Sequence, residues 1–315
     1  MIDRNRLFTA VCIAATSFLT ACGNSDNLST PVTAGTKAGF VIAANGDNSV
    51  SSCVAEASGL ISKCQFVVPD ASLQSLAGIS LTSGRVYLLD IATKAVDVCA
   101  VDMQGVPGQC VTSVVGGLLT MPMGIAVSDT SAYVGDGSGS VIGCGLDKQG
   151  QLSGCTAQTG GGTFSYPSSI TLWNKQVYVL NAGNSTVTRC DAGSSGTLDN
   201  CTAGAIGSLT GSTALSSLTI ASGHAYVTNG TRPELYACTM TASGVISACQ
   251  TVTLDASMGM LGGLTVNGSV LYLASITGDA LGVCALAADG SVSSCQSASG
   301  DAILSPIAVA FKPTA

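Results

Sequence analysis

The sequence predicts an all-β fold, a six-bladed β-propeller with four antiparallel strands in each blade. One observation is a cysteine pair with the spacing C-x5-G-x4-C, which occurs six times with its first cysteines 45 to 48 residues apart. A second is that each repeat contains four short strand-like segments. A third is that the two chain ends complement each other, because the last residues supply a segment that the first repeat lacks.

The most regular segment of each repeat is apolar and ends in a turn-forming residue. Aromatic and β-branched residues followed by Asp, Asn or Ser are typical of a strand that enters a turn. The copies are YLLD (87–90), YVGD (133–136), YVLN (178–181), YVTN (226–229), YLAS (272–275) and, more loosely, FVIA (40–43). Another strand segment precedes it in five repeats, as GISL (78–81), GIAV (124–127), SITL (169–172), SLTI (217–220) and GLTV (263–266).

The cysteine pairs are predicted to clip hairpins. Ten residues with a glycine near their middle bring the two cysteines opposite one another on adjacent antiparallel strands, at a Cα separation of roughly 5.5 Å. Glycine suits the turn because it adopts a positive φ at little cost. Each bridge is expected to contribute about 3 kcal/mol. The predicted disulfides are Cys53–Cys64, Cys99–Cys110, Cys144–Cys155, Cys190–Cys201, Cys238–Cys249 and Cys284–Cys295.

The C-terminal segment is predicted to close the ring. The chain enters the first repeat directly at GFVIAANG, without a GIxV-like segment, and the residues PIAVAF (306–311) provide one at the other end. Pairing of this strand with the first strands of the chain would complete one blade and leave no open sheet edge at the seam.

The YVTN sequence at 226–229 and its approximate copies resemble the repeats of YVTN and NHL-type β-propellers. The resemblance covers residues 39–315 and implies the propeller fold. Proteins of this shape include lactonases, gluconolactonase-like metal hydrolases and binding scaffolds, so the resemblance leaves the function open.

The N-terminus has the features of an export signal. A charged start, MIDRNR, is followed by the 13-residue apolar run LFTAVCIAATSFL and by LTAC at 19–22. The run is short for a membrane span and is typical of a signal peptide. LTAC resembles the lipobox of bacterial lipoproteins, which implies cleavage before Cys22 and acylation of that cysteine; an ordinary secretory signal is the alternative.

The predicted organisation is therefore a lipoprotein signal peptide at 1–21, a lipidated cysteine and flexible tether at 22–38, and the propeller at 39–315. By the same resemblance, Gly23 after the cysteine implies the outer membrane of the bacterial cell envelope. The predicted membrane partner is reached through the lipid on Cys22.

Cysteine usage agrees with an oxidising compartment. Of 14 cysteines, Cys12 would leave with the signal peptide and Cys22 would carry lipid, so the remaining 12 form the six pairs. Exported proteins retain such disulfides. Zinc binding is the alternative, but zinc sites use closer spacings, and the chain has one histidine.

Charge and composition exclude one class of partner. The net charge is -7 and the pI is near 4.4, with only 9% charged residues. Nucleic acids attract basic surfaces, so no nucleic-acid partner is expected. A protein or small-molecule ligand stays open.

No catalytic set is recognised. The single histidine, His224, opens the tyrosine segment of the fifth repeat and is interpreted as an exposed strand edge, so a serine–histidine–acid triad is not expected. The two glutamates, Glu56 and Glu234, do not fall on the segments predicted to line the channel. The residues that match His224 in other repeats are Arg85, Ser131, Gln176 and Val270.

Three aspartates form the one candidate site for a cation. Asp70, Asp255 and Asp301 occupy similar places in loops between blades that become neighbours when the ring closes. Carboxylates bind hard cations, so Ca²⁺ is a possible cofactor. Loop capping by aspartate is the favoured alternative. No other cofactor is expected.

Two further sets of residues fall near the predicted mouth of the ring. Residues that end the tyrosine segments are interpreted as supports for each blade's turn, and four methionines are interpreted as loop packing or an adaptable contact surface. The first set is Asp90, Asp136, Asn181 and Asn229, and the second is Met121, Met123, Met258 and Met260.

The functional prediction is a cell-envelope lipoprotein that displays a propeller surface for binding or scaffolding, with no catalytic site recognised. The alternative is a lactonase-like or other hydrolase that uses a divalent cation at the propeller mouth.

Overall fold

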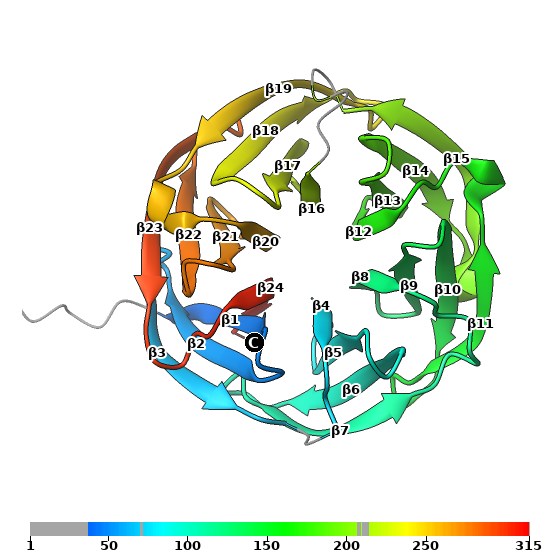
Figure 1. The fold of residues 1–315 in the computed structure, drawn as a ribbon, viewed down its shortest axis with the longest axis horizontal. Coiled ribbons are helices and arrows are strands. Elements are labelled where there is room, and N and C mark those ends of the chain that lie inside the picture. Colours follow the sequence, from blue (N-terminus) through cyan, green and yellow to red (C-terminus); the bar gives the residue numbers. More distant parts are fainter. Residues whose placement is uncertain (1–36, 70–71, 207–208, 210–213, 315) are drawn as a thin grey trace, which may run out of the picture. The chain divides into compact units, whose positions relative to one another are not determined.

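The computed structural model describes residues 37–69, 72–206, 209 and 214–314. The predicted residues Cys22 and Asp70 lie outside this set. The described strands form six four-stranded antiparallel sheets that surround a central axis as the blades of a propeller (Figure 1). The predicted six-bladed fold is confirmed.

The first three blades have the same strand order from the channel outwards. Blade 1 contains β24 (Pro306–Pro313), β1 (Lys37–Asn45), β2 (Val50–Glu56) and β3 (Ile61–Val67). Blade 2 contains β4 (Leu76–Leu81), β5 (Arg85–Asp90), β6 (Ala95–Val101) and β7 (Pro107–Ser113). Blade 3 contains β8 (Pro122–Val127), β9 (Ser131–Asp136), β10 (Ser140–Leu146) and β11 (Leu152–Gln158).

The other three blades follow this order too. Blade 4 contains β12 (Pro167–Trp173), β13 (Gln176–Asn181), β14 (Thr186–Ala192) and β15 (Leu198–Ala205). Blade 5 contains β16 (Leu215–Ala221), β17 (His224–Asn229), β18 (Glu234–Met240) and β19 (Ile246–Thr253). Blade 6 contains β20 (Leu261–Asn267), β21 (Val270–Ser275), β22 (Ala280–Leu286) and β23 (Val292–Ser299).

Helical structure among the described residues consists of short 3-10 turns. These turns are η1 (Gly160–Gly162), η2 (Ser194–Gly196) and η3 (Ala256–Met258). Within the described part of the chain, we find no helix with the length and apolar character needed to cross a bilayer.

The ring is closed within blade 1, as predicted. The C-terminal strand β24 pairs with β1 in antiparallel register, with Val41 opposite Phe311 and Ile42 opposite Ala310. The first and last segments of the chain thus share one sheet, and this sheet lies between blades 6 and 2 (Figure 1). Both chain ends are thus paired in one sheet, and β24 takes the innermost position that β4, β8, β12, β16 and β20 have in the other blades.

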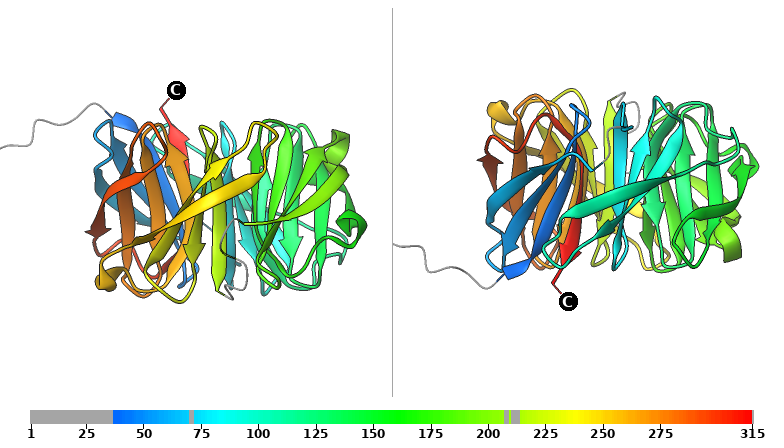
Figure 2. Two further views of the ribbon diagram at one scale, coloured as in Figure 1. Left: turned by 90° about the horizontal axis from the view of Figure 1, so that it is seen from above. Right: turned by 90° about the horizontal axis from the view of Figure 1, so that it is seen from below.

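The two faces of the ring carry different loops, as the side views show (Figure 2). The mouth face holds the loops between blades and the loops after the second strand of each blade. These loops are joined in every blade by at least one backbone hydrogen bond, such as Gly137 N–H to Met121 O at 2.8 Å and Ile276 N–H to Met260 O at 2.8 Å. The opposite face, which we call the hairpin face, holds the turns of the cysteine hairpins.

The core lies between the blades. The second strand of each blade, which we call the tyrosine strand, is buried on both sides because it packs against both neighbouring sheets. Phe40 and Ile42 of blade 1, for example, share one apolar cluster with Ile79 and Val86 of blade 2. Burial raises the pKa of the phenols above their ordinary value, so the rings stay neutral. The buried tyrosines are Tyr87, Tyr133, Tyr178, Tyr226 and Tyr272.

All six predicted disulfides are present, one in each blade, between the two outermost strands. Their Cα separations are 3.9 to 4.1 Å, so the expected value of roughly 5.5 Å was wrong. The strand register shifts at or just after the first cysteine of every pair. The Cα separations of the cysteine pairs are therefore closer to that of a non-hydrogen-bonded pair in an antiparallel ladder than to that of a hydrogen-bonded pair.

The hairpin glycine has a second role that the sequence did not reveal. Every hairpin turn lies against the preceding blade, where a Cβ on the glycine would collide with that blade's residues. Gly290 contacts His224 in this way, so His224 supports the next blade's turn and is not the exposed strand edge that the sequence indicated. The pairs are Gly59 with Val270, Gly105 with Phe40, Gly150 with Arg85, Gly196 with Cys144, Gly244 with Tyr178 and Gly290 with His224.

Candidate functional site

The innermost strands enclose a central channel of about 710 Å³. Its walls are β4, β8, β12, β16, β20 and β24, which converge on the axis with one strand from each blade (Figure 1). Ligands of ring-shaped folds are expected in such a central opening. The channel is therefore the candidate functional site.

Small residues allow the inner strands to approach one another. The third residue of every inner strand is glycine, serine or alanine. A Cβ on Gly124 would lie 2.9 Å from the backbone oxygen of Ser168 in blade 4, and one on Gly263 would lie 2.8 Å from the Cα of Ala308 in blade 1. The six positions are Gly78, Gly124, Ser169, Ser217, Gly263 and Ala308.

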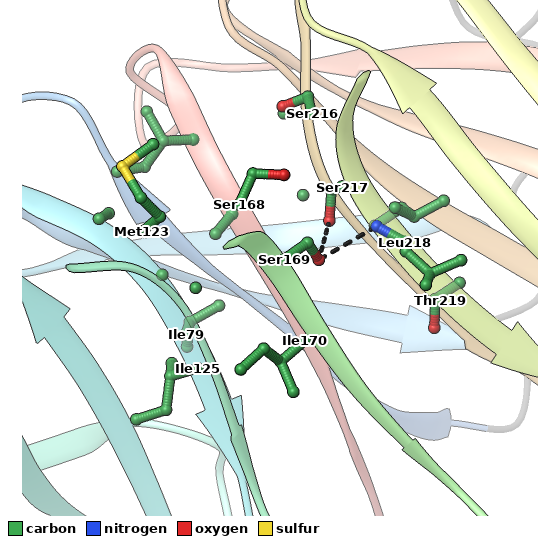
Figure 3. Close-up of a pocket in the computed structure, with 18 of the residues that line it drawn as sticks. Ile79, Met123, Ile125, Ser168, Ser169, Ile170, Ser216, Ser217, Leu218 and Thr219 are labelled. Atoms are coloured by element: carbon green, nitrogen blue, oxygen red, sulfur yellow. Dashed lines mark hydrogen bonds between the residues drawn. The ribbon is translucent and has the colours of Figure 1, made fainter. Parts of the chain in front are cut away.

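The next residue of every inner strand is a branched apolar one, and this layer is largely buried. Ile79, Ile125 and Ile170 lie near one another in the close-up of the channel (Figure 3). The full layer consists of Ile79, Ile125, Ile170, Leu218, Leu264 and Val309. It gives the channel an apolar section below the ring of small residues.

One part of the wall is rich in hydroxyl groups. Figure 3 shows Ser169 of β12 directed at Ser217 of β16, with their hydroxyl oxygens 3.3 Å apart, while Leu218 N–H donates to Ser169 Oγ at 3.1 Å. We call the following set the hydroxyl wall. It consists of Ser168, Ser169, Thr171, Ser216, Ser217 and Thr219.

Most of the other inner strands carry aliphatic side chains at the second position of the strand, the level of Ser168 and Ser216. Strands β24, β4 and β8 contribute Ile307, Ala77 and Met123 at the level where β12 and β16 contribute Ser168 and Ser216. The channel therefore has one wall that is rich in hydrogen-bonding groups and another that offers mainly apolar contact. A bound group with one polar and one apolar side would satisfy both.

The channel wall contains no strong acid or base. None of the described residues that line it is Asp, Glu, Lys, Arg, His or Cys. General acid–base catalysis and nucleophilic catalysis by an activated side chain both depend on such groups. The carboxylate ligands expected for a Ca²⁺ centre are likewise missing from this described lining, so a carboxylate-bound cation does not fit the channel.

The entrance on the mouth face carries exposed apolar side chains. Met121 and Tyr166 precede β8 and β12 and are 36% and 39% exposed. A Cβ on Gly137 would lie 2.6 Å from Met121 Cε and 3.1 Å from Tyr166 Cε2, so both side chains converge over this glycine. Met260 and Leu304 are exposed in the loops that lead to β20 and β24. These four side chains form what we call the apolar rim.

The predicted cation site is placed only in part. Asp255 caps η3 and accepts hydrogen bonds from Ser257 N–H at 2.9 Å and Ser257 Oγ at 2.6 Å, which lower the pKa of its carboxyl. Asp301 is exposed in the loop before β24. Within the described segments, no group of three or more His, Cys, Asp or Glu side chains could hold a metal ion. Asp255 thus has the loop-capping role that the sequence favoured.

The residues that end the tyrosine strands are buried and hold the mouth loops in place. Asp90 accepts from Gln74 N–H at 2.7 Å, and Asp136 accepts from Thr120 N–H at 2.6 Å and Met121 N–H at 2.9 Å. Burial by itself would raise the pKa of Asp136, but its hydrogen bonds outweigh that effect and lower the pKa.

Asn181 makes the same kind of contact with the loop before its blade, whereas Asn229 accepts from the turn that follows it. Ser165 N–H donates to Asn181 Oδ1 at 3.0 Å, and Thr231 N–H donates to Asn229 Oδ1 at 3.0 Å. These contacts agree with the interpretation that such residues serve the turn of each blade.

The hydroxyl wall and half of the apolar rim were not recognised in the sequence. The signal was present, because serine stands at 169 and 217 where the second, third and sixth repeats have glycine at the same strand position. Tyr166 and Leu304 belong to irregular loops without a repeated motif, so their place at the mouth follows only from the structure.

Comparisons with known proteins give the fold and no family. No protein-family model matches the chain, and no curated protein matches it. A chain of a nidogen–laminin complex superposes with a TM-score of 0.67 at 12% identity, covering 87% of this chain and 98% of that chain.

Two bacterial proteins are also similar in structure. The periplasmic gluconolactonase of Pseudomonas aeruginosa has a TM-score of 0.58 at 11% identity, covering 88% of this chain and 99% of that one. A candidate 6-phosphogluconolactonase of Bacteroides fragilis has a TM-score of 0.61 at 12% identity, covering 90% and 99%. At such identities the likeness establishes a shared β-propeller fold, and function must be argued from the site.

Proposed function

We propose that this protein is a binding module whose ligand site is the channel entrance on the mouth face. The observation that carries the proposal is the composition of the channel, which has a volume of about 710 Å³ and is lined by aliphatic groups, hydroxyls, backbone and the Tyr166 ring, without a carboxylate, imidazole, amine, guanidinium or thiol among the described lining residues. Such a wall can hold a ligand by apolar contact and hydrogen bonds, but among its described residues it offers no carboxylate, imidazole or amine to activate a nucleophile.

We further propose that the protein acts as a lipoprotein of the bacterial cell envelope and belongs among YVTN and NHL-type propellers. The LTAC stretch at 19–22 and the six disulfides support export with acylation at Cys22. Lys37, the first described residue, stands at the hairpin-face end of β1, where it lies opposite Glu56.

Site-specific cross-linking tests the binding site. A photoreactive amino acid replaces Met123, inside the channel entrance, and in a matched strain replaces Met103, which is 81% exposed on the hairpin face. We expect cross-linked products in cells from the Met123 position that are missing from the Met103 position. Identical products from both positions, or none from Met123, would contradict a ligand site at the mouth.

Substitution of the predicted acylation site tests the anchor. Cys22→Ser removes the thiol that would receive lipid while leaving the propeller residues unchanged. We expect the wild-type chain to fractionate with membranes and to carry acyl mass on its N-terminal peptide, and the variant to lose both. A wild-type peptide without added mass would sink the lipoprotein proposal.

The alternative function is hydrolysis of a lactone, and the likeness to a periplasmic gluconolactonase favours it. The test is release of acid from gluconolactone by the purified protein, with and without Ca²⁺. Since the described channel lining has no carboxylate, we expect no rate above the spontaneous one. A Ca²⁺-dependent rate that Asp255→Ala together with Asp301→Ala abolishes would establish the alternative instead.

A further inference from the structure

The loops of the mouth face are electrically uneven. Four exposed aspartates lie on the loops of blades 6 and 1, and no Lys or Arg occurs anywhere between residues 233 and 311. The nearest cation before this stretch, Arg232, already pairs with Glu234 at 3.7 Å. We call this set the acidic arc. It consists of Asp47, Asp255, Asp279 and Asp301.

The carboxylates of the acidic arc retain capacity to accept hydrogen bonds. Asp279 uses Oδ1 for Ser305 N–H at 2.8 Å, and Asp47 uses Oδ1 for Ser49 N–H at 3.1 Å. The Oδ2 atoms of both have no partner in the described part of the chain. A carboxylate that has one oxygen fixed by its own loop is held in place and can accept a charged donor with the other.

The opposite part of the mouth face is neutral. In blades 3 and 4 and the loops that lead to them, which lie across the channel from blades 6 and 1 (Figure 1), the exposed large side chains include Val114, Met121 and Tyr166. The described loops between β7 and β8 and between β11 and β12 contain no charged residue. The acidic groups thus lie on one side of the entrance, whereas exposed apolar side chains lie on both sides, because Met260 and Leu304 stand in the loops that lead to blades 6 and 1.

We propose that the mouth face docks a cationic, amphipathic peptide segment of another protein. This inference rests on the proposed binding function and names the partner's chemistry. An apolar side chain of the segment enters the channel beside Met121 and Tyr166, and its basic side chains reach the acidic arc. Electrostatic complementarity of this kind steers association and selects partners.

The channel wall favours a peptide over a simple apolar cation. A peptide carries main-chain N–H and C=O groups that lose water on binding and need partners. The hydroxyl wall supplies them, since the hydroxyls of Thr171, Ser216 and Thr219 have no partner in the described structure. Apolar side chains of the same peptide meet the aliphatic residues of β24, β4 and β8.

Fluorescence anisotropy with a synthetic peptide tests the proposal. The probe is a labelled peptide of about ten residues with one phenylalanine and three lysines, measured against the full chain in zwitterionic nanodiscs at low salt. Two companion peptides replace the lysines by glutamate or the phenylalanine by serine. We expect the first probe to bind at least about tenfold more tightly than either companion, and empty nanodiscs to bind none of them.

Matched variants locate the contact. Asp279→Asn with Asp301→Asn removes two charges and retains an acceptor for Ser305 N–H, while Asp102→Asn with Asp289→Asn removes two charges from exposed loops of the hairpin face. We expect the mouth pair to weaken binding about fivefold, an effect that high salt abolishes, and the hairpin-face pair to leave it within about twofold.

The apolar contact has its own pair of variants. Met121→Gln is expected to weaken binding about fivefold at any salt concentration, and Met103→Gln on the hairpin face is expected to have no effect.

Each outcome decides between the two proposals. Equal losses from mouth and hairpin-face variants, equal binding of the glutamate peptide, or equally tight binding of a cationic detergent would overturn the peptide inference. If the peptide fails while Met123 still gives its specific cross-links, the partner chemistry is wrong and the binding function stands. If the peptide does not bind and Met123 gives no specific cross-links, both the peptide inference and the binding function are wrong.

Discussion

The hairpin face and the mouth face of the ring differ in how much they repeat. On the hairpin face, every blade has the same cysteine pair, the same turn glycine and the same contact of that glycine with the preceding blade. On the mouth face, the loops differ in their side chains even where their lengths agree, from the charged loops of blades 6 and 1 to the neutral loops of blades 3 and 4. The repeated features hold the ring together, and the features that differ are those available for recognition.

The mouth face itself contains both kinds of residue. Its buried layer repeats, because the residues that end the tyrosine strands receive backbone N–H groups of the loops in blade after blade. Its exposed layer does not repeat. Substitutions in the repeated parts should therefore change stability, and substitutions in the exposed mouth should change binding.

The largest expected effect concerns the hairpin glycines. Gly196 has a φ of +83°, and a Cβ there would collide with the backbone of Cys144 in blade 3. We expect Gly196→Ala to lower the free energy of unfolding by about 3 kcal/mol in urea titrations. The control is Gly117→Ala on the mouth face, which has a φ of +75° and open space around the position. It should cost about 1 kcal/mol, and equal losses would contradict the role of blade contact.

A smaller effect concerns the buried carboxylate of Asp136. Asp136→Asn should cost about 1 to 2 kcal/mol at neutral pH, because the amide places donors opposite the N–H groups of Thr120 and Met121. Since the pKa of Asp136 is lowered in the folded state, its stabilising effect is present above the unfolded-state pKa and is lost as the pH falls through the folded-state pKa. Thermal melts of the two proteins should therefore converge in acid, and a constant difference would contradict this assignment.

A third prediction compares the loss of stability when each of two buried tyrosines is replaced by phenylalanine. Tyr226 donates to the backbone oxygen of Gly290 in the next blade at 3.0 Å, whereas the hydroxyl of Tyr272 is buried and has no partner in the described structure. We expect Tyr226→Phe to cost about 1 kcal/mol and Tyr272→Phe to be neutral or slightly stabilising. Urea unfolding of both variants is the measurement, and the reverse order would show that the contact between blades is unimportant.

The smallest expected change in stability belongs to the exposed mouth. Met121→Gln should alter the free energy of unfolding by less than about 0.5 kcal/mol, because the side chain is partly exposed and outside the blade cores. A loss as large as that of Gly196→Ala would mean that the apolar rim serves packing.

The fold could be predicted from the sequence because its determinants repeat at a fixed period. The glycine of each cysteine hairpin and the complementary chain ends specified six blades and their closure, and β24 pairs with β1 accordingly. The contact of Gly290 with His224 joins residues from two blades, and no local pattern contains it. A varying position such as His224 was therefore interpreted as solvent-exposed.

The site was less accessible to sequence reasoning. Asp255 stood out as a possible ligand because carboxylates are recognisable, yet it caps its own loop. The hydroxyl pair of Ser169 and Ser217 is formed from strands 48 residues apart, and serine is too common to mark a site by itself. The apolar rim could not be predicted because the exposure of its loop side chains is set by tertiary packing.

The most direct test of the account is to measure unfolding free energy and probe-peptide affinity together on Gly196→Ala, Tyr226→Phe, Met121→Gln and the Asp279→Asn/Asp301→Asn pair. We expect the first two variants to lose stability and, while folded, to bind the peptide normally, and the last two to keep their stability and bind the peptide weakly. Mouth variants that bind normally, or hairpin-face and core variants that lose affinity without unfolding, would contradict it.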